Sequence, residues 1–392
     1  MEKLSYILLF ILLLAGCKGD NPVAPVYTYQ PIWSQPGYNA RNTSNPYATK
    51  TIMNPVLNGV EEWTFTFQGT NFSDGSQFCV DSRGFIYYLH QDYDSPALYK
   101  FSAKGEVAWK KDSLIQWNYC GISLNSDESR IYVVAFKGQS GDKLYCIDSA
   151  GNEIWSLPNG TPCKPAIGKN GTLYLYHNSI LSAVSPEGNI LWQNPSILIL
   201  YGVSPLALDK EDNIYTISYY HNIVKLDKYG TIIWSYNIND MSAGIVIDGY
   251  GNIYFNGWNK NTMFCLNSDG NLKWTKSNAN GFSTPVITSD NKILLSKSKY
   301  ITAFDTAGTE LWKTQAFNTS YAVEGIMLDD FDNVYYLGDC FPIRAGSISA
   351  DGINRWEYNS ADMWGTLPPP VLIPQGKFLF APKRAGKIRA LN

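Results

Sequence analysis

The sequence is poor in charge. Asp, Glu, Lys and Arg make up only 17% of its 392 residues, against about 25% in an ordinary globular chain. The formal net charge is −3, from 31 Lys and Arg against 34 Asp and Glu, and no run of Lys or Arg occurs. The chain therefore lacks the basic stripe that binds a phosphate backbone, and nucleic acid is not expected as a partner.

The usual signatures of a reaction are also missing. The sequence has three His, no adjacent pair of Cys and no nucleophile motif, phosphate-binding glycine loop or zinc spacing. The Asp-rich turn at residues 329–333 lacks the pattern of a calcium loop. We therefore expect no catalytic residue, no metal and no cofactor.

No apolar run is long enough to span a bilayer. The run from Ile7 to Leu14 is shorter than the about 20 residues that a transmembrane helix needs. With Lys3 before it and small residues after it, it has the pattern of a secretory signal peptide, residues 1–16, rather than of a membrane anchor. Residues 14–17, LAGC, resemble the bacterial lipobox, in which the Cys is acylated and becomes the mature N-terminus.

Lipidation at Cys17 would decide where the protein resides. Several acyl chains on one residue exceed the reversible binding of a single chain. Residues 17–30 hold two prolines and no apolar periodicity, which predicts a flexible tether. Lys18 stands where the resemblance associates Asp with retention in the inner membrane. We therefore expect an outer-membrane lipoprotein that faces the periplasm or the cell surface.

Aromatic residues are abundant, and most of the tryptophans recur at one spacing. Aromatics reach 14%, and eight of the twelve Trp stand four positions after a Gly. These eight repeat residues are Trp63, Trp109, Trp155, Trp192, Trp234, Trp274, Trp312 and Trp356. The interval averages about 42 residues, which fits the four-stranded blades of a propeller and not shorter helical repeats. We expect each repeat Trp to be buried between neighbouring blades.

Strand patterns run in phase with this repeat. Short runs rich in Ile, Val and Tyr, such as GTLYLY (171–176) and GNIYFN (251–256), precede each later Trp and are bounded by turn residues. Each unit thus contains four strands, A to D, of which D ends at the Trp. The last unit is split, because residues 371–392 supply strands A to C and residues 59–63 supply strand D. The sequence therefore predicts one all-β domain, an eight-bladed propeller over residues 31–392, closed by pairing of its two ends.

The repeat resembles that of the PQQ-like, or quinoprotein-like, β-propellers. The resemblance rests on segments such as CIDSAGNEIW (146–155), KLDKYGTIIW (225–234) and AFDTAGTELW (303–312). Enzymes of that superfamily carry pyrroloquinoline quinone, calcium, a catalytic Asp and usually a vicinal disulfide, whereas this chain has no adjacent Cys pair. It is more similar to the lipid-anchored propeller subunit of the outer-membrane barrel assembly machinery. That similarity implies a scaffold for other proteins, without a cofactor.

Cysteine and histidine offer two weaker candidates for a site. Cys120 and Cys163 occupy nearly equivalent positions in strand A of consecutive units, so they are the pair to test for a disulfide. The favoured interpretation is that the cysteines other than Cys17 are small buried hydrophobic residues. His90, His177 and His221 fall at or just after strand B, and His177 with His221 could contribute to a metal site. Exposed loop histidines are the favoured interpretation, because no third ligand stands nearby in the sequence.

The remaining aromatics gather on one predicted face of the ring. In this strand order the B–C and D–A connections share one face, while the opposite face consists of short turns. The residues that we expect to bind on the former face are Trp117, Tyr201, Tyr219, Tyr220, Trp258, Tyr321 and Trp364, with Tyr93, Phe282 and Phe317 in the same connections. Loops on a rigid scaffold commonly carry binding, and Trp and Tyr are typical interface anchors. The hypothesis is a monomeric, non-enzymatic scaffold or recognition module that binds a protein. A surface glycan-binding lipoprotein is the alternative, and a PQQ- or metal-dependent enzyme is less favoured.

Overall fold

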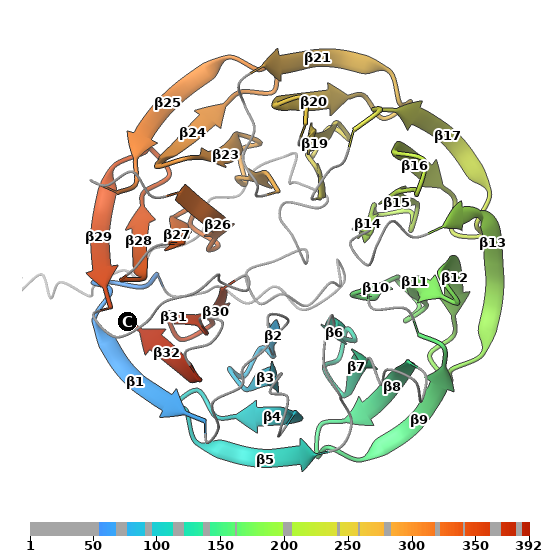
Figure 1. Ribbon diagram of the computed structural model, residues 1–392, viewed down its shortest axis with the longest axis horizontal. Helices are drawn as coiled ribbons and strands as arrows, with labels where there is room; N and C mark the ends of the chain where they lie inside the picture. The colour runs from blue at the N-terminus through green and yellow to red at the C-terminus, as the bar shows by residue number, and fades with distance from the viewer. Residues whose placement is uncertain are drawn as a thin grey trace, which may run out of the picture.

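The structure is a ring of eight four-stranded sheets. The computed structural model describes residues 55–67, 77–90, 96–112, 121–135, 142–160, 163–198, 206–240, 244–257, 259–277, 284–317, 322–339, 342–360, 370–381 and 386–392. In these residues every sheet is antiparallel and no helix occurs, so none could cross a membrane. Figure 1 shows the sheets as blades around a common centre. The predicted eight-bladed propeller is confirmed.

The blades follow one another in chain order, each with strands A to D. Blades 1 to 4 are β2 (Gln77–Val80), β3 (Ile86–His90), β4 (Ala97–Phe101), β5 (Val107–Asp112); β6 (Gly121–Leu124), β7 (Arg130–Ala135), β8 (Lys143–Asp148), β9 (Glu153–Pro158); β10 (Ala166–Ile167), β11 (Leu173–His177), β12 (Ile180–Val184), β13 (Ile190–Leu198); and β14 (Leu206–Leu208), β15 (Ile214–Ile217), β16 (Asn222–Leu226), β17 (Ile232–Asn237). Blades 5 to 8 are β18 (Ile245–Ile247), β19 (Ile253–Gly257), β20 (Thr262–Leu266), β21 (Leu272–Ser277); β22 (Val286–Ile287), β23 (Ile293–Lys297), β24 (Tyr300–Phe304), β25 (Glu310–Gln315); β26 (Ala322–Leu328), β27 (Val334–Asp339), β28 (Arg344–Ile348), β29 (Asn354–Asn359); and β30 (Val371–Ile373), β31 (Lys377–Phe380), β32 (Lys387–Leu391), β1 (Glu61–Thr66).

Strand A lies at the centre of the ring and strand D at its perimeter (Figure 1). The A strands are short apolar runs, such as Ile245–Ile247, that are buried throughout. The D strands alternate exposed and half-buried residues, as in Ile232–Asn237, because one side of the strand meets solvent. We call the face made by the B–C and D–A connections the loop face, and the face made by the A–B and C–D turns the turn face.

The ring closes at the C–D turn of blade 8, which is formed by the two ends of the chain instead of by one continuous segment. Strand β1 pairs antiparallel with β32, from Glu61 opposite Leu391 to Thr66 opposite Lys387. The carbonyl of Asn392 accepts from the N–H of Gly59 at 2.7 Å, and the N–H of Asn392 donates to Val60 at 3.0 Å. Intact C–D turns make the same two bonds between their first residue and residues three and four positions later. The predicted split blade is therefore confirmed, and its two ends reproduce the hydrogen bonds of a continuous turn.

The repeat Gly and Trp connect each blade to the next. A Cβ atom at Gly270 would lie 2.6 Å from the Trp234 ring, and one at Gly59 would lie 2.3 Å from the Trp356 ring. Gly is required for two reasons, the close approach of the ring and a positive φ, which is +82° at Gly270. In six blades the indole N–H also donates, at 2.9 to 3.1 Å, to the carbonyl two residues before the Gly of the next blade.

The repeat Trp rings differ in burial and in the hydrogen bond of the indole N–H. Only Trp356 is buried, and the other seven are half-buried because strand D lies at the perimeter. The rings lie between neighbouring blades, but seven of them keep part of their surface exposed. The indole N–H of Trp312 has no hydrogen-bond partner among the described residues. Beside it, Thr314 Oγ1 donates to the carbonyl of Gly352 in the next blade at 2.5 Å.

A second set of inter-blade links lies on the turn face. At the fourth position of the A–B turn, four blades carry a non-glycine residue with positive φ, namely Glu128, Asp212, Asn291 and Asp332. Each side chain accepts a hydrogen bond from the second residue of the A–B turn in the preceding blade, as Glu128 does from the Ser82 N–H at 2.8 and 2.9 Å. These bonds offset the cost of the left-handed backbone.

Candidate functional site

Two exposed tyrosine rings project from the loop face of blade 4. Tyr219 and Tyr220 form the centre of the B–C turn between β15 and β16, with exposed fractions of 41% and 63%. Their ring centroids lie 5.6 Å apart in an edge-to-face arrangement. Apolar aromatic area of this kind, with a hydroxyl at its tip, is suited to recognition by contact.

The backbone beneath these rings is tied to two neighbouring strands. The N–H of Tyr219 donates to the carbonyl of Leu198, the last residue of β13 in blade 3, at 3.0 Å. The N–H of Ile238 donates to the carbonyl of His221 at 3.1 Å, which connects the turn to the end of β17. The tyrosine pair is thus presented by a preorganised turn rather than by a long loop.

Asp240 anchors the adjacent loop-face connection in blade 5. Its buried carboxylate accepts from the backbone N–H groups of Asn259 at 3.0 Å and of Lys260 at 2.8 Å. Lys260 Nζ in turn donates to the carbonyl of Ile238 at 2.7 Å. These bonds fix the segment that follows position 258, next to the turn of the tyrosine pair. The sequence did not indicate this role of Asp240, because an Asp in a connection between strands is usually a turn former.

The other expected binding residues fall outside the described part of the chain. This applies to Trp117, Tyr201, Trp258, Tyr321 and Trp364, to Tyr93 and Phe282, and to Cys17. Phe317, which the sequence also placed in a D–A connection, is buried and packs against Tyr336 at 5.2 Å. It fills the space over Gly338, so it is part of the packing between strands.

The histidines are less exposed than their positions predicted. His90 and His177 end strands β3 and β11, and both are buried. His90 stacks on Phe67 with centroids 3.8 Å apart. His177 Nε2 lies 2.9 Å from the carbonyl of Pro158, and its Nδ1 lies 3.2 Å from Gln193 Nε2. The interpretation as exposed loop histidines was therefore wrong for these two, because strand B extends one residue further than expected. The described residues contain no group of three His, Cys, Asp or Glu that could hold a metal ion.

The described cysteines are buried side chains. Cys79, Cys146, Cys163 and Cys265 all lie in the interior, as the favoured interpretation predicted. Burial raises the pKa of Cys146 to about 11 and that of Cys163 and Cys265 to about 12, so these thiols are protonated and unreactive at neutral pH. Cys120, the expected partner of Cys163, lies outside the described residues.

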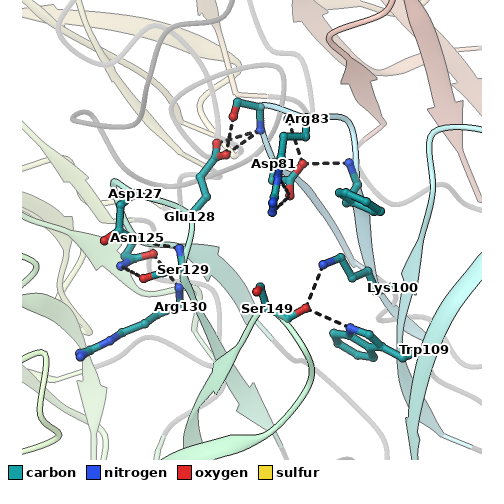
Figure 2. A network of polar contacts seen from close by, with 12 residues as sticks. Asp81, Arg83, Lys100, Trp109, Asn125, Asp127, Glu128, Ser129, Arg130 and Ser149 are labelled. Atoms are coloured by element: carbon teal, nitrogen blue, oxygen red, sulfur yellow. Dashed lines mark hydrogen bonds and ion pairs between the residues drawn. The ribbon is translucent and has the colours of Figure 1, made fainter.

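Polar groups on the turn face hold the blades together. Figure 2 shows this for blades 1 and 2, where Lys100 Nζ and Trp109 Nε1 both donate to the carbonyl of Ser149 in the next blade, at 2.9 and 3.1 Å. Glu128 accepts from the Ser82 hydroxyl at 2.6 Å as well as from its N–H. Lys100 and Glu128 in Figure 2 thus bind backbone and hydroxyl groups of the neighbouring blade, and their arrangement is that of a structural joint.

One charged pair of the same network shows the local electrostatics. Asp81, fully buried, accepts from Arg83 Nη2 at 2.8 Å and from two backbone N–H groups of its own turn. This bond raises the pKa of Arg83. Burial lowers the pKa of Lys100, whose Nζ lies 4.4 Å from the centroid of the Phe85 ring. Both contacts hold these side chains against the turn.

The turn face also carries exposed aromatic rings that the sequence interpretation passed over. Tyr229 and Tyr250 lie in the C–D turn of blade 4 and the A–B turn of blade 5, and both are exposed. Sorting aromatics by connection could have found them, since Tyr229 stands directly before a repeat Gly. Among the described residues, exposed tyrosines therefore occur on both faces.

The fold defines the class of protein, an eight-bladed β-propeller, and its repeat is similar to that of the PQQ-like propellers. The chain is similar to the outer membrane protein assembly factor BamB. The model of the BamB family matches residues 177–330 and 221–363, which together span just under half of the chain. The structure of BamB from Moraxella catarrhalis superposes with a TM-score of 0.60 at 13% identity, over 85% of this chain and 99% of that one. No curated protein sequence matches the chain.

Enzymes share the propeller architecture. A catalytically inactive virginiamycin B lyase from Staphylococcus aureus with quinupristin superposes with a TM-score of 0.54 at 14% identity, over 79% of this chain and 98% of that one. A streptogramin B lyase gives 0.51 at 16% identity, over 69% and 92%. At these identities the likeness establishes the fold alone, so function has to be argued from the side chains.

Proposed function

We propose that this protein is a non-enzymatic propeller, anchored by lipid at the bacterial outer membrane, that recruits a protein partner on its loop face. The observation that carries the proposal is the exposed, preorganised pair Tyr219 and Tyr220. Tyrosine buries a large area at a low cost in side-chain entropy, and a turn held in place avoids the cost of ordering on binding. The likeness to an outer membrane protein assembly factor supports a protein as the partner.

Two described groups whose pKa burial shifts towards neutrality lie far apart in the ring. Burial lowers the pKa of Lys164 to about 7 and raises that of Asp332 to about 6. Lys164 lies in the D–A connection before β10 in blade 3, whereas Asp332 lies in the A–B turn of blade 7. The two residues are therefore on opposite faces and on distant blades, where they cannot act together as an acid and a base.

Anchoring is the second part of the proposal. Residues 1–16 are the signal peptide, Cys17 carries the lipid, residues 17–30 form the tether, and the propeller domain extends from residue 31 to 392. Mass spectrometry of the protein purified from membranes should find a mature chain that begins at acylated Cys17, and a C17S variant should leave the membrane fraction. An unmodified, uncleaved N-terminus would refute this part.

Affinity capture tests the recruitment of a partner. We expect a Y219S/Y220S double variant to lose the proteins that the wild-type chain retains from detergent-solubilised native membranes. A Y229S/Y250S variant is the matched control, because it removes the same number of exposed rings from the turn face. Equal capture by both variants would refute the loop-face proposal. Binding of the wild type to a glycan array, lost only in Y219S/Y220S, would instead favour the glycan-binding alternative.

A further inference from the structure

Three exposed apolar side chains surround the point where the two ends of the described chain meet. Leu57, Val60 and Ile353 have exposed fractions of 73%, 56% and 68%. Residues 55–60 lie along β29, because the carbonyl of Val56 accepts from Arg355 Nη2 at 3.0 Å and from Trp356 Nε1 at 3.3 Å. We call Leu57, Val60 and Ile353 the corner patch. It lies on the turn-face side of blades 7 and 8.

Two members of the corner patch stand at a position that is polar in the other blades, although D strands elsewhere also expose apolar side chains. Val60 and Ile353 each follow the repeat Gly directly, after Gly59 and Gly352. The other six blades have a polar residue at this position, namely Glu106, Asn152, Asn189, Thr231, Asn271 and Thr309. The turn itself therefore requires no apolar side chain here, and folding does not account for the exposed Val and Ile.

The acidic residues beside the patch are largely neutralised. Glu61 is paired with Arg389 at 2.8 Å, and Glu62 is paired with Lys377. Asp351 remains exposed on the same turn as Ile353. This environment suits an uncharged apolar surface better than a basic partner or an anionic lipid surface.

We propose that the corner patch rests on the membrane that holds the lipid of this protein, with Leu57, Val60 and Ile353 inserted at the level of the lipid headgroups. The inference rests on the lipid anchoring of the proposed function. Residues 17–54 join the lipid on Cys17 to Pro55, so the described part of the propeller is connected to the lipid at this corner. Attachment to the bilayer raises the effective concentration of the patch at the membrane surface, which populates a contact that would be weak for a free protein. The loop face is on the other side of the ring and remains accessible.

Photocrosslinking from the bilayer tests this contact. The mature, lipidated protein is placed in vesicles of phosphatidylcholine and phosphatidylethanolamine that contain a lipid with a photoreactive group at the headgroup end of its acyl chain. We expect crosslinked lipid on peptides that contain residues 55–60 and 349–353. The variant L57S/V60N/I353T should reduce this yield by about tenfold or more, since three apolar contacts are lost. It should still fold, because Asn and Thr are native after the repeat Gly in other blades and Leu57 is exposed.

A matched control and a second anchor make the result specific. The variant L191S/I232T/I233T removes three exposed apolar side chains from blades 3 and 4, across the ring from β1 and β29 (Figure 1), and should leave the yield unchanged. The same proteins, with a histidine tag before residue 18 and bound to nickel-chelating lipid, should give the same pattern. Crosslinks spread evenly over both faces, equal yields for the two triple variants, or crosslinking of the patch to a protein instead of lipid would each overturn the inference. Absence of an acyl chain on Cys17 would overturn the native anchoring, while the nickel-anchored proteins would still decide whether the patch contacts the bilayer.

Discussion

The pair Trp274 and Trp312 offers a direct test of what holds the blades together. Both are half-buried repeat residues in adjacent blades, and each ring lies over the Gly of the next blade, with 3.1 Å from a Cβ at Gly308 to Trp274 and 2.7 Å from one at Gly352 to Trp312. Only Trp274 donates an indole hydrogen bond, to the carbonyl of Thr306 at 3.0 Å. Trp312 has no partner for its N–H among the described residues.

Replacement of each residue by Phe separates the hydrogen bond from the ring contact. Both substitutions remove a similar part of the ring, but only W274F also removes a bond and leaves the Thr306 carbonyl unpaired. A hydrogen bond of this kind contributes about 1 kcal/mol net. W274F should therefore be less stable than W312F by about that amount, or about 1 to 2 °C in the unfolding midpoint of a chain of this size.

Calorimetry and denaturant unfolding of the two variants beside the wild type measure this difference. Equal losses for W274F and W312F would refute the role of the indole bond and leave only the contact of ring and Gly. A greater loss for W312F would contradict the reasoning entirely. Removal of the whole side chain, in W274A, should cost about 2 to 3 kcal/mol, below the 3 to 5 typical of a fully buried ring, because the perimeter exposes one side of the indole.

Two further predictions concern the closure of the ring and its dependence on pH. Deletion of Asn392 should destabilise the protein by about 2 kcal/mol, because its backbone makes the closing bonds to Gly59 and Val60, whereas N392A, which keeps that backbone, should stay close to wild type in the same denaturant assay. Burial raises the pKa of Asp332 to about 6, above the roughly 3.9 of an unfolded chain. The folded state therefore binds this proton more tightly, and the contribution of Asp332 to stability falls as pH rises from about 4 to about 6 and is constant above. D332N should flatten this part of the pH profile of the unfolding midpoint, and an unchanged profile would contradict it; Asn is tolerated at the equivalent position in blade 6, where Asn291 also has positive φ.

The ring could be predicted from the sequence because its main contact needs two rare residues at a fixed spacing. Gly must accept a positive φ and the face of an indole at once, so neither Gly59 nor Gly270 can be replaced without loss, and the repeat stays visible. The links of the A–B turns were not predicted. Glu128 and Asp332 look like ordinary turn residues, and their partners Ser82 and Ser289 lie more than 40 positions away in another blade.

The loop face was predicted as a region but not in its construction. Alternating strands determine which connections share a face, so Tyr219 and Tyr220 could be assigned to it. Burial inside a connection depends on packing between blades, which a single strand pattern does not contain. This is why Phe317 and His177 are interior residues, and why the role of Asp240 beneath the adjacent loop had no sequence signal.

The central claim is that protein partners bind the loop face, whereas the polar network of the turn face holds the blades together. Lysine crosslinking of the protein in its native membrane, read by mass spectrometry, tests it most directly because exposed lysines stand on both faces. We predict more crosslinks to other proteins at Lys260, beside the tyrosine pair, than at the turn-face residues Lys104, Lys169 and Lys228. Partner crosslinks on the three turn-face lysines, with none on Lys260, would contradict the account.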